Sequence, residues 1–206
     1  MQNDIVDQLI AQIKRLEKEL RNELQAKQDD IFYQIDKKKV RFEKDVRAKH
    51  RKLKKKLHRF LLESPLLHYL TAPVIWSVLI PAIMLDGFIT IYQFICFPVY
   101  KIPAVKRSQF IIIDRHALGY LNIIEKINCV YCAYCNGLLA YVQEIAARTE
   151  QYWCPIKHAR RVAYTHSRYT YFFDYGDGES YREKLEEVRR QFDDLREEKE
   201  LLVSKN

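Results

Sequence analysis

Residues Leu66–Tyr100 read LLHYLTAPVIWSVLIPAIMLDGFITIYQFICFPVY, and Asp86 is the single fixed charge among these 35 residues. An apolar run of about 18 residues or more is long enough to span a bilayer as a helix. Shortly before this run, the 13 residues Arg47–Arg59 carry eight Lys or Arg and no acid. Basic blocks of this kind flank membrane spans on the cytoplasmic side. The sequence therefore predicts a membrane protein whose N-terminal part lies in the cytosol.

The chain as a whole is basic, and the basic charge is not evenly spread. Its 206 residues are 48% hydrophobic and 30% charged, with a formal net charge of +8 that is concentrated around residues 37–59. This block adjoins the apolar stretch, which favours anionic lipid headgroups as its partner and makes nucleic acid unlikely. The residues expected at the membrane surface are Arg47, Lys49, Arg51, Lys52, Lys54, Lys55, Lys56 and Arg59.

Residues 5–60 follow an 11-residue repeat, in which apolar residues recur in steps of four, four and three. The three rows of the repeat are Leu9, Leu20, Ile31, Phe42, Leu53; Ile13, Leu24, Ile35, Val46, Leu57; and Ile5, Leu16, Lys27, Lys38, Lys49, Phe60. A period of about 3.67 residues per turn keeps these rows on one face of a nearly straight helix. We predict one long helix over 1–62 that packs as a coiled coil with a copy of itself or a partner. A helix lying on the membrane surface and a mobile solvated helix are the alternatives.

The apolar stretch is too long for one simple span. A single helix through its 35 residues would extend about 52 Å, against a hydrocarbon core of about 30 Å. We therefore predict a transmembrane or re-entrant hairpin over 63–103, with Asp86-Gly87 as a solvated turn. Lys and Arg flank both ends, which favours a cytoplasmic location for both. A single span ending near Leu85, followed by an interfacial helix, is the alternative. For Asp86 the alternative is a functional carboxylate inside the membrane.

Four of the five cysteines follow this stretch, within 30 residues of one another and of a histidine. The candidate ligands are Cys129, Cys132, Cys135, Cys154 and His158. C-x2-C spacing suits zinc, and C-x2-C-x2-C with a remote Cys-Pro resembles iron–sulfur ferredoxins. Asn136-Gly137 is expected as a turn that wraps the segment around an ion. Thiols packed as small apolar residues on one helix face, and thiol redox chemistry, are the alternatives. The odd number of cysteines suits a reducing compartment.

These patterns predict an all-α fold in five segments. The segments are the long helix over 1–62, the hairpin over 63–103, a helical cysteine-rich segment over 104–165, an aromatic and Gly-containing turn region over 166–178, and a charged helix over 179–206. A helix capped by Asp114 opens the third segment. The turn Asp174–Gly178 introduces the last helix, with Glu179 and Ser180 in its first turn. Glycine-rich phosphate loops and nucleophile elbows do not occur in the sequence.

Several short motifs look like those of an uncharacterised bacterial membrane-protein family. They are Phe97-Pro-Val-Tyr, Ile112-Ile-Asp-Arg, Tyr120-Leu-Asn, Asn128-Cys-Val-Tyr-Cys and Arg148-Thr-Glu-Gln-Tyr-Trp-Cys-Pro-Ile-Lys-His. The resemblance covers roughly residues 65–165 and implies a bacterial source without an established activity.

Taken together, the sequence predicts a bacterial inner-membrane protein with no visible secretory signal and both termini in the cytoplasm. The expected role is non-enzymatic, through self-association or partner tethering by the N-terminal helix. The alternative is a membrane-bound zinc, iron–sulfur or redox protein that uses the cysteines.

Overall fold

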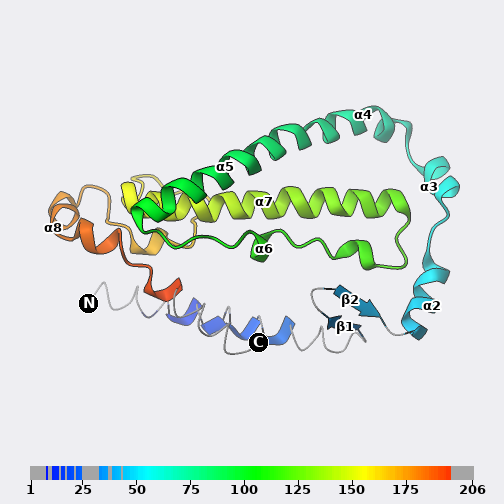
Figure 1. Ribbon diagram of the computed structural model, residues 1–206, viewed down its shortest axis with the longest axis horizontal. Coiled ribbons are helices and arrows are strands. Elements are labelled where there is room, and N and C mark those ends of the chain that lie inside the picture. Colours follow the sequence, from blue (N-terminus) through cyan, green and yellow to red (C-terminus); the bar gives the residue numbers. More distant parts are fainter. Residues whose placement is uncertain are drawn as a thin grey trace. The chain divides into compact units, whose positions relative to one another are not determined.

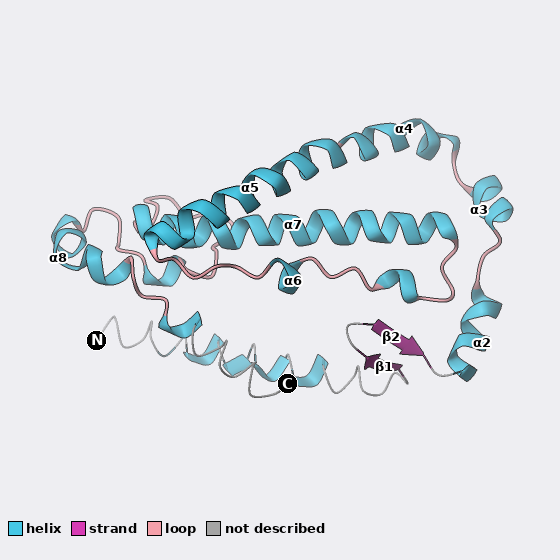
Figure 2. Ribbon diagram, in the orientation of Figure 1, coloured by secondary structure: helices cyan, strands magenta, loops and turns pink. Residues whose placement is uncertain are grey.

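The computed structural model describes residues 8, 11–13, 15–16, 18–20, 22–24, 33–36, 39–42 and 44–195. The chain divides into two compact units. One unit comprises Met1–Leu61 with Asp114–Lys126, and the other comprises Leu62–Ile113 with Ile127–Asn206. The described residues are predominantly helical, as predicted, and they include two short strands (Figures 1 and 2).

The prediction of one unbroken helix over 1–62 is wrong. All described residues between 8 and 24 are helical, but strands β1 (Tyr33–Asp36) and β2 (Lys39–Phe42) then form an antiparallel hairpin. In the sequence, apolar and polar residues alternate through YQID and KVRF. That period of two favours strands at the same positions where the 11-residue repeat favours a helix.

Two further helices follow the strands. Helix α2 (Lys44–Leu53) and helix α3 (Leu57–Glu63) are separated by the non-helical residues 54–56. Within the first unit, α2 lies against the segment that precedes α7, because the rings of His50 and Tyr120 meet edge to face with 5.0 Å between centroids.

The apolar stretch is helical from end to end. Helix α4 (Leu66–Ser77) is followed after Val78 by helix α5 (Leu79–Tyr100). Val78 itself has right-handed helical dihedrals, φ −63° and ψ −21°. The boundary falls here because Pro81 lacks the N–H that would bond the Ser77 carbonyl. Within the described residues, Leu66–Tyr100 is the one helical stretch long and apolar enough to cross a membrane.

The predicted turn at Asp86-Gly87 is wrong, since both residues lie inside α5. A single Gly costs only about 1 kcal/mol in a helix interior and does not by itself break the helix. The chain turns at Lys101 instead, which adopts a left-handed conformation with φ 57°. The amides of Lys101 and Ile102 donate to the carbonyls of Pro98 (3.2 Å) and Phe97 (2.9 Å). This Schellman pattern ends the helix.

From Lys101 the chain runs back as a largely non-helical return segment, residues 102–113, which contains the short helix α6 (Arg107–Phe110). A 3-10 turn, η1 (Arg115–Ala117), follows. Helix α7 (Ile123–Trp153) then begins eight residues later than predicted, and Asp114 makes no capping bond. Asn122 and Glu125 cap α7 instead. The amide of Glu125 donates to Asn122 Oδ1 (3.0 Å), and the amide of Asn122 donates to Glu125 Oε2 (2.7 Å). This reciprocal pair is a capping box.

Helices α5 and α7 run in the same direction, with the return segment alongside (Figure 1). Tyr131 near the start of α7 donates to the Ile75 carbonyl (2.8 Å), and Tyr152 near its end stacks on Tyr100 at 5.0 Å between centroids. The buried core of this unit lies among α5, the return segment, α7 and the C-terminal segment. Its residues are Phe97, Ile102, Val105, Leu138, Tyr141, Ile145 and Phe192.

The C-terminal part confirms one predicted turn and shortens one predicted helix. After the 3-10 turn η2 (Tyr169–Tyr171), the turn Asp174–Gly178 leads into α8 (Gly178–Val188), as predicted. Asp177 caps α8 by accepting a bond from the Ser180 amide (3.0 Å), and hydrogen bonding from Ser180 lowers the pKa of Asp177. The helix predicted over 179–206 stops at Val188, and the residues after 195 lie outside the described ones.

Asn136-Gly137, also predicted as a turn, lies inside α7. Here Gly137 is needed for close packing rather than for a turn. A Cβ added at this position would lie 2.6 Å from the Phe110 carbonyl oxygen and 2.9 Å from the Ile111 Cα. Both atoms belong to the backbone of the return segment, which therefore contacts α7 through the space that the glycine leaves.

The first prediction compares two glycines in helices. Gly137→Ala should lower the melting temperature of the protein in detergent, because overpacking costs about 1–3 kcal/mol and outweighs the gain of up to about 1 kcal/mol in helix propensity. Gly87→Ala is the control, since a Cβ there meets nothing within 4 Å. It should leave the melting temperature unchanged or raise it. A Gly137→Ala protein that melts at or above the parent would contradict this packing.

Candidate functional site

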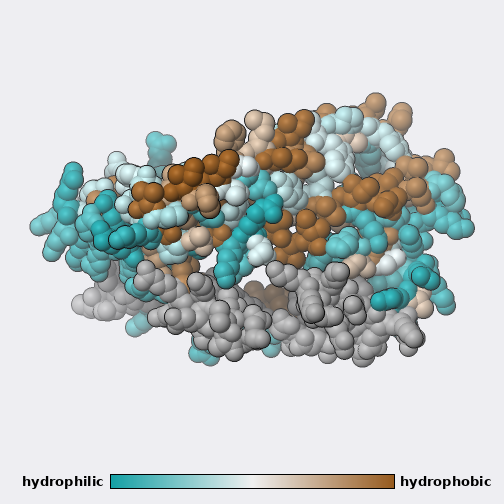
Figure 3. All heavy atoms as spheres, in the orientation of Figure 1, coloured by the Kyte–Doolittle hydropathy of each residue, from teal (hydrophilic) through white to brown (hydrophobic). Residues whose placement is uncertain are grey.

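Most residues of helix α5 are exposed, and its contacts with the rest of its unit include the hydrogen bonds of two polar side chains. Across α4 and α5, Phe97 is the one buried residue. On the face that Figure 3 shows, hydrophobic residues gather along α5 and part of α4, with paler residues among them. Two polar residues of α5, Asp86 and Gln93, lie seven residues apart and hence on the same helix face. We call the contacts of these two side chains the polar lock.

The side chain of Gln93 forms hydrogen bonds with both the backbone amide and the backbone carbonyl of Val105 in the return segment. Its side-chain oxygen accepts from the Val105 amide (2.8 Å), and its side-chain nitrogen donates to the Val105 carbonyl (3.2 Å). The same nitrogen donates to the Tyr141 hydroxyl of α7 (3.1 Å). A buried backbone amide or carbonyl without a partner is costly. The side chain of Gln93 therefore supplies the hydrogen-bond partners that a helix or sheet would otherwise provide to Val105. It also connects α5, the return segment and α7.

Asp86 forms the second half of the polar lock. Its carboxylate accepts from Arg107 Nη2 (2.6 Å) and Nε (3.2 Å), and from the Tyr134 hydroxyl (3.0 Å). The two bonds from one guanidinium form the bidentate geometry that arginine makes with carboxylates. The Asp86 side chain is 15% exposed, so the prediction of a solvated turn residue is wrong.

The structure does not bring the five predicted metal ligands together. Cys129, Cys132 and Cys135 lie on α7, whereas Cys154 follows the last residue of the same helix. At about 1.5 Å per residue, α7 separates Cys135 from Cys154 by about 28 Å. Among the described residues, no group of three or more His, Cys, Asp or Glu side chains is arranged to hold a metal ion.

The predicted lipid-contacting residues are all at the surface. Arg47, Lys49, Arg51 and Lys52 lie on α2, Lys54, Lys55 and Lys56 lie between α2 and α3, and Arg59 lies on α3. Each of these eight residues is exposed. Their role at a lipid surface stays a prediction.

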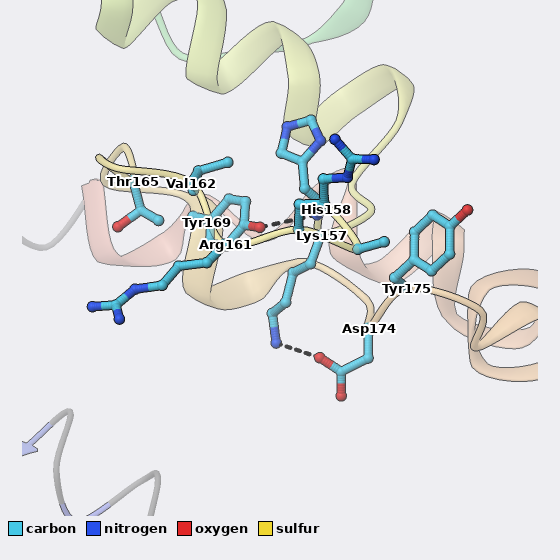
Figure 4. Close-up of a pocket in the computed structure, with 10 residues that line it drawn as sticks. Lys157, His158, Arg161, Val162, Thr165, Tyr169, Asp174 and Tyr175 are labelled. Atoms are coloured by element: carbon cyan, nitrogen blue, oxygen red, sulfur yellow. Dashed lines mark hydrogen bonds and ion pairs between the residues drawn. The ribbon is translucent and has the colours of Figure 1, made fainter.

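His158, the fifth predicted ligand, lines a hollow of about 350 Å³ just beyond the end of α7 (Figure 4). We call this the basic hollow. Its lining residues are Lys157, His158, Ala159, Arg160, Arg161, Val162, Thr165, Tyr169, Asp174 and Tyr175. The lining thus contains three basic residues, Lys157, Arg160 and Arg161, and a single carboxylate, Asp174. For this part of the chain the sequence predicted only an aromatic and Gly-containing turn region over 166–178, so this site was missed.

The loop that forms the basic hollow is held at both ends. At one end, the Lys157 amide donates to the Phe173 carbonyl (2.8 Å), and the Phe173 amide donates to the Pro155 carbonyl (2.8 Å). At the other end is Arg168, whose side chain is 1% exposed. Arg168 donates to Gln151 Oε1 (2.5 Å), to Asp194 Oδ2 (2.5 Å) and to the Gln191 carbonyl (2.6 Å).

Comparisons with protein-family models, with curated proteins and with solved structures find no match to this chain. The family resemblance over residues 65–165 therefore stays an expectation from the sequence.

The polar lock yields the second prediction. Asp86→Leu and Arg107→Leu should each lower the free energy of unfolding in detergent by about 1–3 kcal/mol, because each leaves a charged partner unpaired. The double variant Asp86→Leu/Arg107→Leu should recover most of that loss, since apolar pairs can replace ion pairs at little cost. Melting temperatures of the four proteins complete a double-mutant cycle. Additive losses would show that the two side chains do not act as a pair.

Proposed function

We propose that this chain is an integral membrane protein with a tethering role. Helices α4 and α5 anchor it in the bilayer, and the helical N-terminal segment associates with a second copy of the chain. The observation that carries the proposal is the exposure of the apolar helical stretch Leu66–Tyr100, in which Phe97 is the one buried residue. An exposed apolar surface of this size is unfavourable in water, so it favours a nonpolar environment. A bilayer supplies such an environment to a helix of this length.

The polar lock supports insertion of more than one element. Asp86 is 14 residues from the end of α5 at Tyr100, which is about 21 Å along the helix. Non-helical backbone at membrane depth is tolerated where protein groups satisfy its polar atoms. Gln93 does this for Val105, and Asp86 neutralises Arg107. The return segment can therefore enter the bilayer together with α5.

Because the helix continues through Asp86, it also affects the membrane face that each end of the apolar stretch reaches. A hairpin would place both of its ends on the cytoplasmic face, whereas a span that continues past Asp86 separates the Leu66 end from the Tyr100 end. We propose that the N-terminal segment is cytoplasmic and that the basic hollow lies on the opposite face, in a bacterial inner membrane. The ring contacts of Tyr100 with Tyr152 and Trp153, at 5.0 and 5.2 Å between centroids, bring the ends of α5 and α7 together. This proximity supports a common membrane face for the two helix ends.

The tethering role rests on the N-terminal stripe. Ile13, Leu16, Leu20 and Leu24 lie on described helical positions and are 53–62% exposed. An amphipathic helix of this kind gains stability when its apolar face is covered by another helix. Because a second copy carries the same apolar stripe and would cover it, a second copy is the occupant that we propose.

The third prediction tests orientation with native thiols. In intact cells that express the full chain, a membrane-impermeant maleimide should label Cys154, which is exposed, and peptide mass spectrometry identifies the labelled cysteine. Lys54→Cys is the matched control on the N-terminal side of the anchor. It should react only after the membrane is broken. If Cys154 also requires broken membranes, the proposed crossing is excluded.

The fourth prediction tests self-association. A photo-crosslinking residue, p-benzoylphenylalanine, in place of Leu20 should give a covalent product of twice the chain mass in membranes. The same residue in place of Lys18 is the control, because positions 18 and 20 lie about 200° apart around the helix. Equal yields at the two positions, or no product at Leu20, would overturn pairing through the stripe.

A further inference from the structure

The basic hollow holds more positive charge than the protein itself compensates. Lys157 Nζ contacts Asp174 Oδ1 at 2.7 Å. Among the described residues, no acid forms an ion pair with Arg160 or Arg161, which are both exposed in the lining. Like charges gathered in one concavity repel one another and raise the local concentration of anions. The lining of the hollow therefore carries a net positive charge that favours an anion.

The donors in the hollow suit one class of anion. Each arginine presents a planar fork of N–H groups that matches a phosphate or carboxylate, and lysine adds a compact charge. The hydroxyl of Thr165 and the ring of His158 complete a lining of hydrogen-bonding groups. In Figure 4, Lys157 and Asp174 point toward each other, and Arg161 extends away from this pair. A ligand with three or more acceptor oxygens can engage several of these donors together.

The framework of the hollow is held in place before any ligand arrives. The backbone bonds of Phe173 with Lys157 and Pro155 hold one end of the loop, and buried Arg168 holds the other. Between them, the amide of His158 donates to the Tyr169 hydroxyl (2.9 Å), a contact drawn in Figure 4. A loop fixed in this way loses little further freedom when a ligand binds, which favours affinity.

The position of the hollow indicates where its ligand is found. Lys157 follows Trp153 by four residues, and Trp153 is 51% exposed beside Tyr100 at the end of α5. Tryptophan and tyrosine concentrate at the level of lipid headgroups. Given the membrane anchoring proposed above, the hollow lies at or just outside that level.

We propose that the basic hollow binds a phosphate group, with Arg160 and Arg161 as its main ligands. Lys157 joins them when the phosphate competes with Asp174 for its ammonium group. The phosphate belongs either to an anionic lipid headgroup or to a free phosphate or phosphate ester in solution. The binding chemistry is the same in both cases.

The fifth prediction compares two probes and three variants of the full chain in a non-ionic detergent. Inorganic phosphate is titrated by calorimetry, and retained phosphatidylglycerol is counted by native mass spectrometry with phosphatidylcholine as the neutral-headgroup control. Arg160→Gln/Arg161→Gln should bind about tenfold more weakly or worse, because two charge-assisted contacts are lost. Arg182→Gln/Lys184→Gln removes the same charge from the exposed face of α8. This control should stay within about twofold of the parent.

Asp174→Asn changes binding in the opposite direction. It frees Lys157 and should strengthen binding by about twofold or more, since an opposing carboxylate is removed. Because one variant weakens and another strengthens binding, misfolding cannot produce the expected pattern.

The two probes separate the possible sources of phosphate. Sensitivity of both probes, or of the phosphate titration alone, to the arginine variant identifies a free phosphate or phosphate ester. Sensitivity of phosphatidylglycerol retention alone identifies a headgroup. If the parent binds neither probe, if the α8 control loses as much as the arginine variant, or if Asp174→Asn does not strengthen binding, the proposal is overturned. The phosphate titration needs no bilayer, so its result is independent of the Cys154 labelling that tests the anchor.

Discussion

The hydrogen bonds between the Gln93 side chain and both backbone groups of Val105 are the constraint on which the second unit depends. The return segment is largely non-helical, so its amides and carbonyls lack the partners that a helix provides internally. Beside an apolar helix, such groups are costly when unpaired, and more so inside a bilayer. Gln93 removes the cost of unpaired backbone groups at the point where the segment enters the core. Val105 is therefore buried beside Phe97 and Tyr141, with 4% of its surface exposed. The same amide reaches Tyr141, so the position of α5 along α7 is set by the same side chain.

Asp86 and Gly137 determine the rest of that arrangement. An ion pair in a largely apolar setting contributes little net stability, because desolvation offsets most of the attraction. It does select one register, since a shift of α5 along the return segment would leave both Asp86 and Arg107 unpaired. Gly137 sets the distance on the other side of the segment, where a Cβ would approach the Phe110 carbonyl to 2.6 Å. The polar side chains of Gln93 and Asp86, together with the lack of a Cβ at Gly137, thus determine how α5, the return segment and α7 pack side by side.

The sequence predicted the apolar helix, the exposed basic block, the turn before α8 and the predominance of helix, because each of these depends on local composition or spacing. It failed where two local patterns compete or where a distant partner decides. Tyr33–Phe42 fits both a helical repeat and a strand alternation. Asp86-Gly87 looks like a turn until Arg107 and Tyr134 supply partners for the carboxylate. Asp114 was predicted as the cap, but in the structure the reciprocal hydrogen bonds of Asn122 and Glu125 cap α7 instead. The cysteine spacing indicated shared ligands only as long as α7 was assumed to break at Gly137.

Arg160, Arg161 and Arg168 show why the candidate binding site could not be predicted. They lie within nine residues and are chemically identical. Arg168 donates hydrogen bonds to Gln151, Gln191 and Asp194, and its guanidinium lies 4.4 Å from the ring centre of Tyr171. That network is the reason the neighbouring loop has a fixed shape. Arg160 and Arg161 contribute nothing comparable to the fold, so their charge is left for a ligand. Burial therefore divides one cluster of like residues into a structural cation and two binding cations, and burial depends on contacts with residues up to 26 positions away.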